Sequence, residues 1–180
     1  MKKSLILVLV AFVCLSAVYA SGNAVKVSVV PYGWQITTSS ADNENPFSSK
    51  YGIGLEASYQ LGIEKGFYAE MGLGWNTFIM KDDRPAFTNI LAFAGLGYRY
   101  DFNDKLSCSA NAGVGTDTLI YISKASETVT LRSALDVSYA ISDSLELSLG
   151  CRGTFGFAKD ESANYVNYRI LPVLGISYKF

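Results

Sequence analysis

The last stretch of the chain, Tyr165 to Phe180, reads YVNYRILPVLGISYKF. Its even-numbered positions are all apolar: Val166, Tyr168, Ile170, Pro172, Leu174, Ile176, Tyr178 and Phe180. The odd-numbered positions form a mixed, largely polar row. Because successive side chains of a β-strand point to opposite faces, this stretch predicts a strand with one apolar face along its whole length.

The same alternation recurs throughout the chain after its first 20 residues. It predicts strands at residues 25–36, 50–61, 67–76, 89–101, 106–115, 129–141, 145–157 and 165–180, which makes eight. In the first of these the apolar register slips by one near Pro31. A β-bulge produces such a slip, and Pro31 and Gly33 are residue types that a bulge tolerates.

The predicted connections alternate between longer and shorter ones. Longer connections are expected at residues 37–49, 80–88, 119–127 and 158–165, and short turns at 62–66, 102–105 and 142–143. This alternation is typical of membrane barrels, in which one rim carries longer loops than the other. The sequence therefore predicts an all-β fold, an eight-stranded antiparallel up-and-down transmembrane β-barrel with both termini at the short-turn rim.

The charged residues of the strands lie on the row opposite the apolar one, among many Gly and Ser. They are Glu56, Glu70, Arg99, Arg132, Asp136, Glu146, Arg152 and Arg169. A soluble eight-stranded barrel of the lipocalin type would turn its apolar face inward instead. The interior of eight strands is just wide enough for side chains, so small residues among paired charges fit there, and lipid outside with charge inside is the better interpretation.

The aromatic residues of the apolar row favour the same orientation. One group is expected near the short-turn rim: Tyr59, Phe67, Tyr98, Tyr100, Tyr139, Tyr178 and Phe180. A second group is expected toward the long-connection rim: Trp34, Tyr51, Trp75, Phe155, Phe157 and Tyr168. Aromatic belts at both interfaces are characteristic of membrane barrels.

Residues 1–20 are predicted to be a cleaved secretory signal peptide, which leaves 21–180 as the barrel. Lys2 and Lys3 precede an apolar run, and the segment ends Val18-Tyr19-Ala20. A membrane anchor is the alternative, but the run is shorter than the ~20 residues that a spanning helix needs. Of the 15 basic residues two lie here, so the remainder has 13 basic against 16 acidic residues, a net charge of −3. No basic patch for nucleic acid is expected.

Catalysis is not expected of this chain. It contains no His, which removes the Ser-His and His-based acid-base arrangements, and no catalytic residue, cofactor or metal site is predicted. Cys108 and Cys151 are expected on the lipid-facing rows of two strands that are not neighbours. They would then be roughly 10 Å apart at the ~4.8 Å strand spacing, beyond disulfide reach.

Two stretches resemble the small OmpA-type or OmpX-type outer-membrane β-barrel family. Ala94-Gly95-Leu96-Gly97-Tyr98-Arg99-Tyr100 resembles its Gly-alternating strand, and Gly175-Ile176-Ser177-Tyr178-Lys179-Phe180 resembles its C-terminus. The resemblance covers the whole mature chain. It implies location in the outer membrane and recognition of the closing strand, with Tyr178 and Phe180 as assembly signal, by the outer-membrane assembly machinery.

The family includes adhesins, small-solute channels, structural anchors and a few lipid-modifying enzymes. With catalysis not expected, two functions stay open. The first is a structural or surface-interaction role through the exposed connections, which would contact a host or surface ligand, with the interior closed by paired charges. The second is a narrow channel for small or hydrophobic solutes. Outer-membrane lipid is the expected surrounding, and a monomer the expected state.

Overall fold

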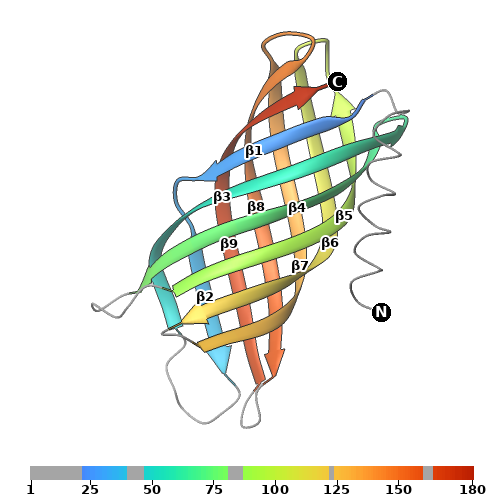
Figure 1. Ribbon diagram of the computed structural model, residues 1–180. Helices are drawn as coiled ribbons and strands as arrows, with labels where there is room; N and C mark the ends of the chain where they lie inside the picture. The colour runs from blue at the N-terminus through green and yellow to red at the C-terminus, as the bar shows by residue number, and fades with distance from the viewer. Residues whose placement is uncertain (1–21, 40–46, 81–86, 122–123, 160–163) are drawn as a thin grey trace.

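The computed structural model describes residues 22–39, 47–80, 87–121, 124–159 and 164–180. They form nine strand segments in one closed antiparallel sheet (Figure 1). The segments are β1 (Ala24–Val30), β2 (Trp34–Ser39), β3 (Phe47–Glu64), β4 (Phe67–Met80), β5 (Phe87–Asp101), β6 (Leu106–Tyr121), β7 (Lys124–Ala140), β8 (Leu145–Lys159) and β9 (Asn164–Lys179). The predicted signal peptide, residues 1–20, lies outside the described residues.

The segments β1 and β2 together occupy one position in the barrel wall. Both pair with β3 on one side and with β9 on the other, so the barrel has eight strands with the first one interrupted. Each remaining strand pairs with its neighbour in sequence, and the pairing of β3 with β4 completes the ring. The predicted eight-stranded up-and-down architecture is confirmed.

The interruption between β1 and β2 differs from the predicted single bulged strand. Residues 31–33 leave the strand altogether, and Val29 and Trp34 both face outward although one position is odd and the other even. The change of register that the sequence predicted near Pro31 is therefore present. A proline cannot donate to the strand ladder, which explains why the chain leaves the sheet here instead of bulging within it.

The short turns lie at one rim together with the start of β1 and the end of β9, as predicted. The Phe180 N–H donates to Asn23 O at 3.1 Å, and Lys179 N–H donates to Ser144 O at 2.8 Å. The first turn is a two-residue hairpin at Lys65 and Gly66, with φ of 51° and 88°. Two successive positive φ values match the right-handed twist of the flanking strands. A side chain at Gly66 would collide with the carbonyl oxygen of Arg99.

At the opposite rim, the long-connection rim, the strands run further than the sequence predicted. The pairing of β6 with β7 continues to Tyr121 and Lys124, within the stretch 119–127 that was expected to be a loop. That part of the prediction is wrong because cross-strand pairing, rather than local composition, decides where a strand ends. The remaining parts of the four predicted loops, 40–46, 81–86, 122–123 and 160–163, lie outside the described residues.

The outer face of the barrel is apolar over the length of the strands. Leu55, Leu73, Leu96, Leu135 and Leu149 are at least half exposed, far beyond what a water-soluble surface carries as one continuous belt. Their neighbours in sequence lie on the inner face and are buried or half-buried. Within the described residues, no helix is long and apolar enough to cross a membrane.

Candidate functional site

Seven of the eight charged residues selected from the sequence are buried inside the barrel. Glu56, Glu70, Arg132, Asp136, Glu146, Arg152 and Arg169 are each less than 10% exposed. The eighth, Arg99, lies close to the short-turn rim, and its side chain is 26% exposed. The structure divides the eight between three separate groups at different levels of the lumen.

The largest group, the central ion cluster, contains Lys26, Glu56, Glu70, Arg132, Asp136 and Arg152. Glu56 Oε1 accepts from Arg132 Nη2 at 2.6 Å and from Arg152 Nε at 3.1 Å. Glu56 belongs to β3 and Arg132 to β7, which lie on opposite sides of the ring. This ion pair therefore crosses the full width of the lumen.

The rest of the central ion cluster extends from this crossing to both walls. Arg152 Nη1 contacts Asp136 Oδ1 at 2.9 Å, and Lys26 Nζ reaches the same oxygen at 2.9 Å. Arg132 Nη1 lies 3.7 Å from Glu70 Oε2, and its guanidinium carbon lies 3.8 Å from the centre of the Phe93 ring. Three cations and three carboxylates thus balance each other in the middle of the barrel.

Polar residues that the sequence analysis did not select complete this cluster. Asn111 donates to Glu70 and accepts from Arg132 Nη1 at 3.1 Å, and Ser58 Oγ donates to Glu70 at 2.7 Å. Lys26 was missed as well, although its place between Val25 and Val27 on a strand indicates an inward side chain. The small residue Gly150 provides space, because a side chain there would collide with the Asp136 carboxylate.

The second group joins Arg169 on β9 to Asp117 on β6. Arg169 Nη2 donates to Asp117 Oδ2, and Asn89 Nδ2 donates to the same oxygen at 3.0 Å. Arg169 is buried inside the barrel but is paired separately from Arg132 and Arg152, a pairing that the sequence alone did not indicate. Asp117 was missed because the predicted strand ended at residue 115, whereas β6 continues to Tyr121.

The third group, the mouth ion cluster, lies at the short-turn rim and contains Arg99, Asp101, Glu146 and Lys179. Arg99 makes two bonds to Glu146, at 2.6 and 2.8 Å, and Lys179 Nζ contacts Glu146 Oε1 at 2.5 Å. Glu146 is thus paired with the two cations of its own rim, a pairing that the sequence alone did not indicate.

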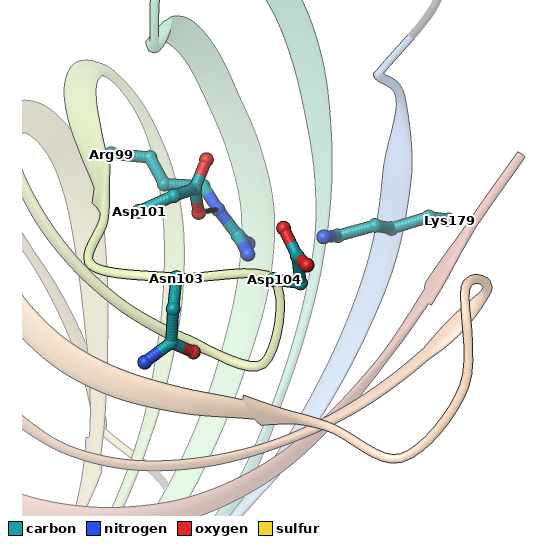
Figure 2. A pocket seen from close by; sticks show the side chains of 5 residues that line it. All are labelled: Arg99, Asp101, Asn103, Asp104 and Lys179. Atoms are coloured by element: carbon teal, nitrogen blue, oxygen red, sulfur yellow. Dashed lines mark hydrogen bonds and ion pairs between the residues drawn. The ribbon is translucent and has the colours of Figure 1, made fainter.

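An open hollow of about 320 Å³ lies at this mouth, lined by Arg99, Asp101, Asn103, Asp104 and Lys179 (Figure 2). Figure 2 shows the Lys179 side chain pointing toward Asp104, with Arg99 and Asp101 on the other side of the hollow. Its lining is polar and charged throughout. Drug-sized ligand pockets are mostly apolar, so this hollow has the character of a hydrated vestibule.

Part of the lumen is apolar, which the polar composition of the inner row did not predict. Val30, Phe78, Leu171 and Val173 form a buried cluster, each no more than 3% exposed. The Phe78 ring is in close contact with the backbone of Gly52, where a side chain would collide with it. Leu171 and Val173 belong to the same inward row of β9 as Arg169, so the interior alternates between ion pairs and packed hydrocarbon.

The two cysteines of the barrel have free thiols. Cys108 lies on β6 and Cys151 on β8, with β7 between them. Among the described residues, no cluster of three or more His, Cys, Asp or Glu has the arrangement of a metal site. The absence of a catalytic, cofactor or metal site stays a prediction.

The terminal aromatic residues close the barrel at the short-turn rim. The Phe180 ring lies 6.4 Å from the Tyr178 ring and 6.3 Å from the Tyr59 ring, measured between centroids. Tyr178 pairs with Val25 on β1 and Leu145 on β8. At the other end of the strands, Phe155 contacts the Phe157 and Tyr168 rings. Rings therefore gather near both rims, while the Tyr51 side chain lies outside the described residues.

No protein-family model and no curated protein matches the sequence. Solved structures do match it. Neisserial surface protein A is 17% identical with a TM-score of 0.64, covering 88% of this chain and 97% of its own. OprG of Pseudomonas aeruginosa is 9% identical with a TM-score of 0.59, covering 89% and 97%. A major outer-membrane protein of Thermus thermophilus is 12% identical with a TM-score of 0.54, covering 90% and 100%.

These likenesses extend over nearly the whole of the described barrel, while the sequence identities are all low. They show a shared architecture and do not distinguish between the activities of the proteins compared. The chain has the fold of the small outer-membrane β-barrels.

Proposed function

We propose that this protein is an integral outer-membrane β-barrel whose lumen is closed by buried ion pairs and whose long-connection rim carries a structural or surface-interaction role. The observation that carries the proposal is the ion pair between Glu56 and Arg132, which joins opposite walls of the barrel at 2.6 Å. Eight strands enclose space for side chains and no free aqueous channel. The charges at the centre are paired and buried, which supports a plug.

The proposed membrane location is supported by the outer surface. Every strand presents large apolar side chains outward, and backbone groups find partners within the closed sheet, as a hydrocarbon surrounding requires. The rings toward both rims, such as Phe67 with Tyr98 at 5.0 Å and Phe155 with Phe157 at 4.4 Å, suit the headgroup layers. Location in the outer membrane would follow export by the predicted signal peptide.

The proposed orientation places the short-turn rim and both termini in the periplasm. The stretches 37–49, 80–88, 119–127 and 158–165 would then face outward, where contact with a host or surface ligand becomes possible. The name of the Neisserial barrel, a surface protein, supports this choice. The alternative of a narrow channel is favoured by the polar hollow at the mouth, which would admit water and small ions up to the central ion cluster.

Planar-bilayer recording distinguishes the plug from the channel. The wild-type barrel should conduct rarely, in small and brief events. Replacing Arg152 by Ala removes bulk and one positive partner of Glu56 and Asp136, so the open probability should rise with a preference for cations. The matched control is Lys105→Ala, which removes one positive charge from an exposed turn. A large, steady wild-type conductance that Arg152→Ala leaves unchanged would make the channel the better proposal.

Labelling of intact cells tests the orientation. In a background in which Cys108 and Cys151 are replaced by Ala, single cysteines are introduced as Asn43→Cys and Asp143→Cys. A membrane-impermeant maleimide should label the first variant on intact cells and the second only after the outer membrane is opened. If only Asp143→Cys is labelled on intact cells, the proposed orientation is wrong and the short-turn rim faces the outside.

A further inference from the structure

The hydrogen-bonded wall of the barrel is interrupted beside the middle of β9. The pairing of the first strand with β9 stops at Val29 with Leu174 and resumes at Trp34 with Ile170. Its pairing with β3 is also interrupted between the end of β1 and the start of β2. Residues 31–33, which we call the strap, belong to no strand and cross this gap between β1 and β2 (Figure 1).

Two prolines explain why the ladder to β9 is broken at this place. Phe180 N–H donates to Asn23 O between β9 and the start of β1, and hydrogen-bonded pairs of an antiparallel ladder recur at every second position. Continued in the register of β1 and β9, this series reaches Pro31 opposite Pro172. Neither proline has an N–H to donate, so the sheet can form neither hydrogen bond of this pair.

Apolar side chains lie directly behind the strap, on its lumen side. They belong to the buried cluster of Val30, Phe78, Leu171 and Val173. Gly33 of the strap is in close contact with this cluster, because a Cβ built there would collide with Leu171 Cδ2. The gap in the wall therefore lies against packed hydrocarbon and not against an ion cluster.

The outer side of the strap is apolar as well. Tyr32 and Trp34 are exposed, and their rings meet edge to face with centroids 4.8 Å apart. The outward residues of β9 on either side of the gap, Ile170 and Leu174, are at least half exposed. In the proposed membrane location, one layer of backbone thus separates the apolar part of the lumen from lipid.

Displacement of the strap should cost less free energy than displacement of other parts of the wall. No ladder pair joins the strap to β9, and local opening is easiest where few interactions hold a segment. Opening here brings apolar side chains into contact with lipid. Opening the wall beside Glu56 or Arg152 would instead bring buried ion pairs into contact with hydrocarbon, which is strongly unfavourable.

We infer that the strap is a lateral lid, which opens toward the membrane and admits the hydrocarbon chain of a surrounding lipid to Phe78 and Leu171. An acyl chain suits this place because the cluster offers dispersion contacts along apolar side chains. Phe78 and Val173 are fully buried in the closed state, so the chain enters only when the strap moves. The inference rests on the proposed membrane location and is independent of whether the lumen conducts along its axis.

Photolabelling of the wild-type barrel in lipid vesicles tests the inference without any substitution. The probe is a phospholipid with a diazirine in one acyl chain, and mass spectrometry locates the labelled residues. Leu55 and Leu135 on the outer face should be labelled, which tests the membrane location by itself. Phe78 and Leu171 should be labelled as well. Phe93 is the internal control, because it is buried against Arg132 in the central ion cluster and should remain unlabelled.

The double variant Pro31→Val/Pro172→Val tests the role of the two prolines. It restores both missing donors, so labelling of Phe78 and Leu171 should fall about tenfold, which corresponds to ~1.4 kcal/mol. The matched control Ile170→Val/Leu174→Val changes two outward residues beside the strap without adding a donor, and should leave this labelling unchanged. Circular dichroism verifies that each variant folds.

Each contrary outcome identifies a different error. If the wild-type barrel is labelled on its outer face but not at Phe78 and Leu171, the strap stays closed and the inference is wrong while the membrane location stands. If Leu55 and Leu135 are not labelled either, the membrane location is wrong and the inference fails with it. Labelling of Phe93 as strongly as Phe78 would show that lipid enters by another route and that the strap is not the lid.

Discussion

The central ion cluster and the mouth ion cluster contain the same chemical groups at similar separations but in different surroundings. Arg152 and Asp136 are 2.9 Å apart with side chains 1% and 3% exposed, whereas Arg99 and Asp101 are 2.7 Å apart with side chains 26% and 61% exposed. An exposed ion pair contributes about 0–1 kcal/mol. Removing one member of a buried pair costs about 3–5 kcal/mol, because the remaining charge has no compensation. Burial, and not distance, distinguishes these two ion pairs.

The largest effect should come from Glu56→Gln. This change removes the carboxylate that two arginines share, so both Arg132 and Arg152 lose a charged acceptor inside the barrel. The free energy of unfolding in urea should fall by about 3–5 kcal/mol. The control Glu64→Gln lies at the exposed end of β3 and should change stability by about 0.5 kcal/mol or less. If Glu56→Gln lowers the free energy of unfolding as little as Glu64→Gln does, burial does not make the central ion pairs more important for stability.

Leu55→Arg introduces a charge at the residue before Glu56 on β3, which faces outward instead of into the lumen. Leu55 is 50% exposed on the outer surface, while its neighbour Glu56 is 7% exposed. A positive charge facing lipid near mid-depth should cost ~2 to 4 kcal/mol in vesicle refolding, and the size-matched control Leu55→Met should cost less than about 1.5 kcal/mol. If charge is tolerated at 53, 55 and 57 alike, the barrel is soluble with the opposite polarity.

Deletion of Phe180 tests the short-turn rim without changing a charge. It removes the hydrogen bond to Asn23 and the ring contacts with Tyr178 and Tyr59, worth about 1–2 kcal/mol together. Assembly in cells should fall further, leaving protease-sensitive chain in the periplasm, because we expect the closing strand to be the assembly signal. Phe180→Trp keeps a terminal ring and should assemble. Normal yield of the truncated protein would show that Phe180 is not needed as a signal.

The smallest effect should come from Asp101→Asn at the mouth. Arg99 keeps its two bonds to Glu146, and water reaches the lost partner, so stability should fall by no more than about 1 kcal/mol. High salt should reduce even this difference, since it screens exposed charges. A loss of more than about 2 kcal/mol in the free energy of unfolding that persists at high salt would show that the Arg99–Asp101 pair behaves like a buried ion pair.

The sequence by itself determined the strand pattern and the facing of the wall. An alternation of period two is visible within a single strand, as in Tyr165 to Phe180, because adjacent side chains must point to opposite faces whatever the strand pairs with. The slip near Pro31 was visible for the same reason. The inward direction of the Lys26 side chain was predictable in the same way, because its neighbours in sequence are two outward-facing valines.

Only the closed barrel decided which charges meet and where each strand ends. Glu56 and Arg132 are 76 positions apart in sequence, and Asp117 and Arg169 are 52 apart; no local pattern relates such residues. Their contacts depend on ring closure, strand tilt and the height of each side chain in the lumen. The same closure separates Arg169 from the other arginines' carboxylates and extends β6 far enough to bring Asp117 to it. The side of the wall to which a side chain points is decided within one strand, whereas the charged partner that it meets is decided by the closure of the whole barrel.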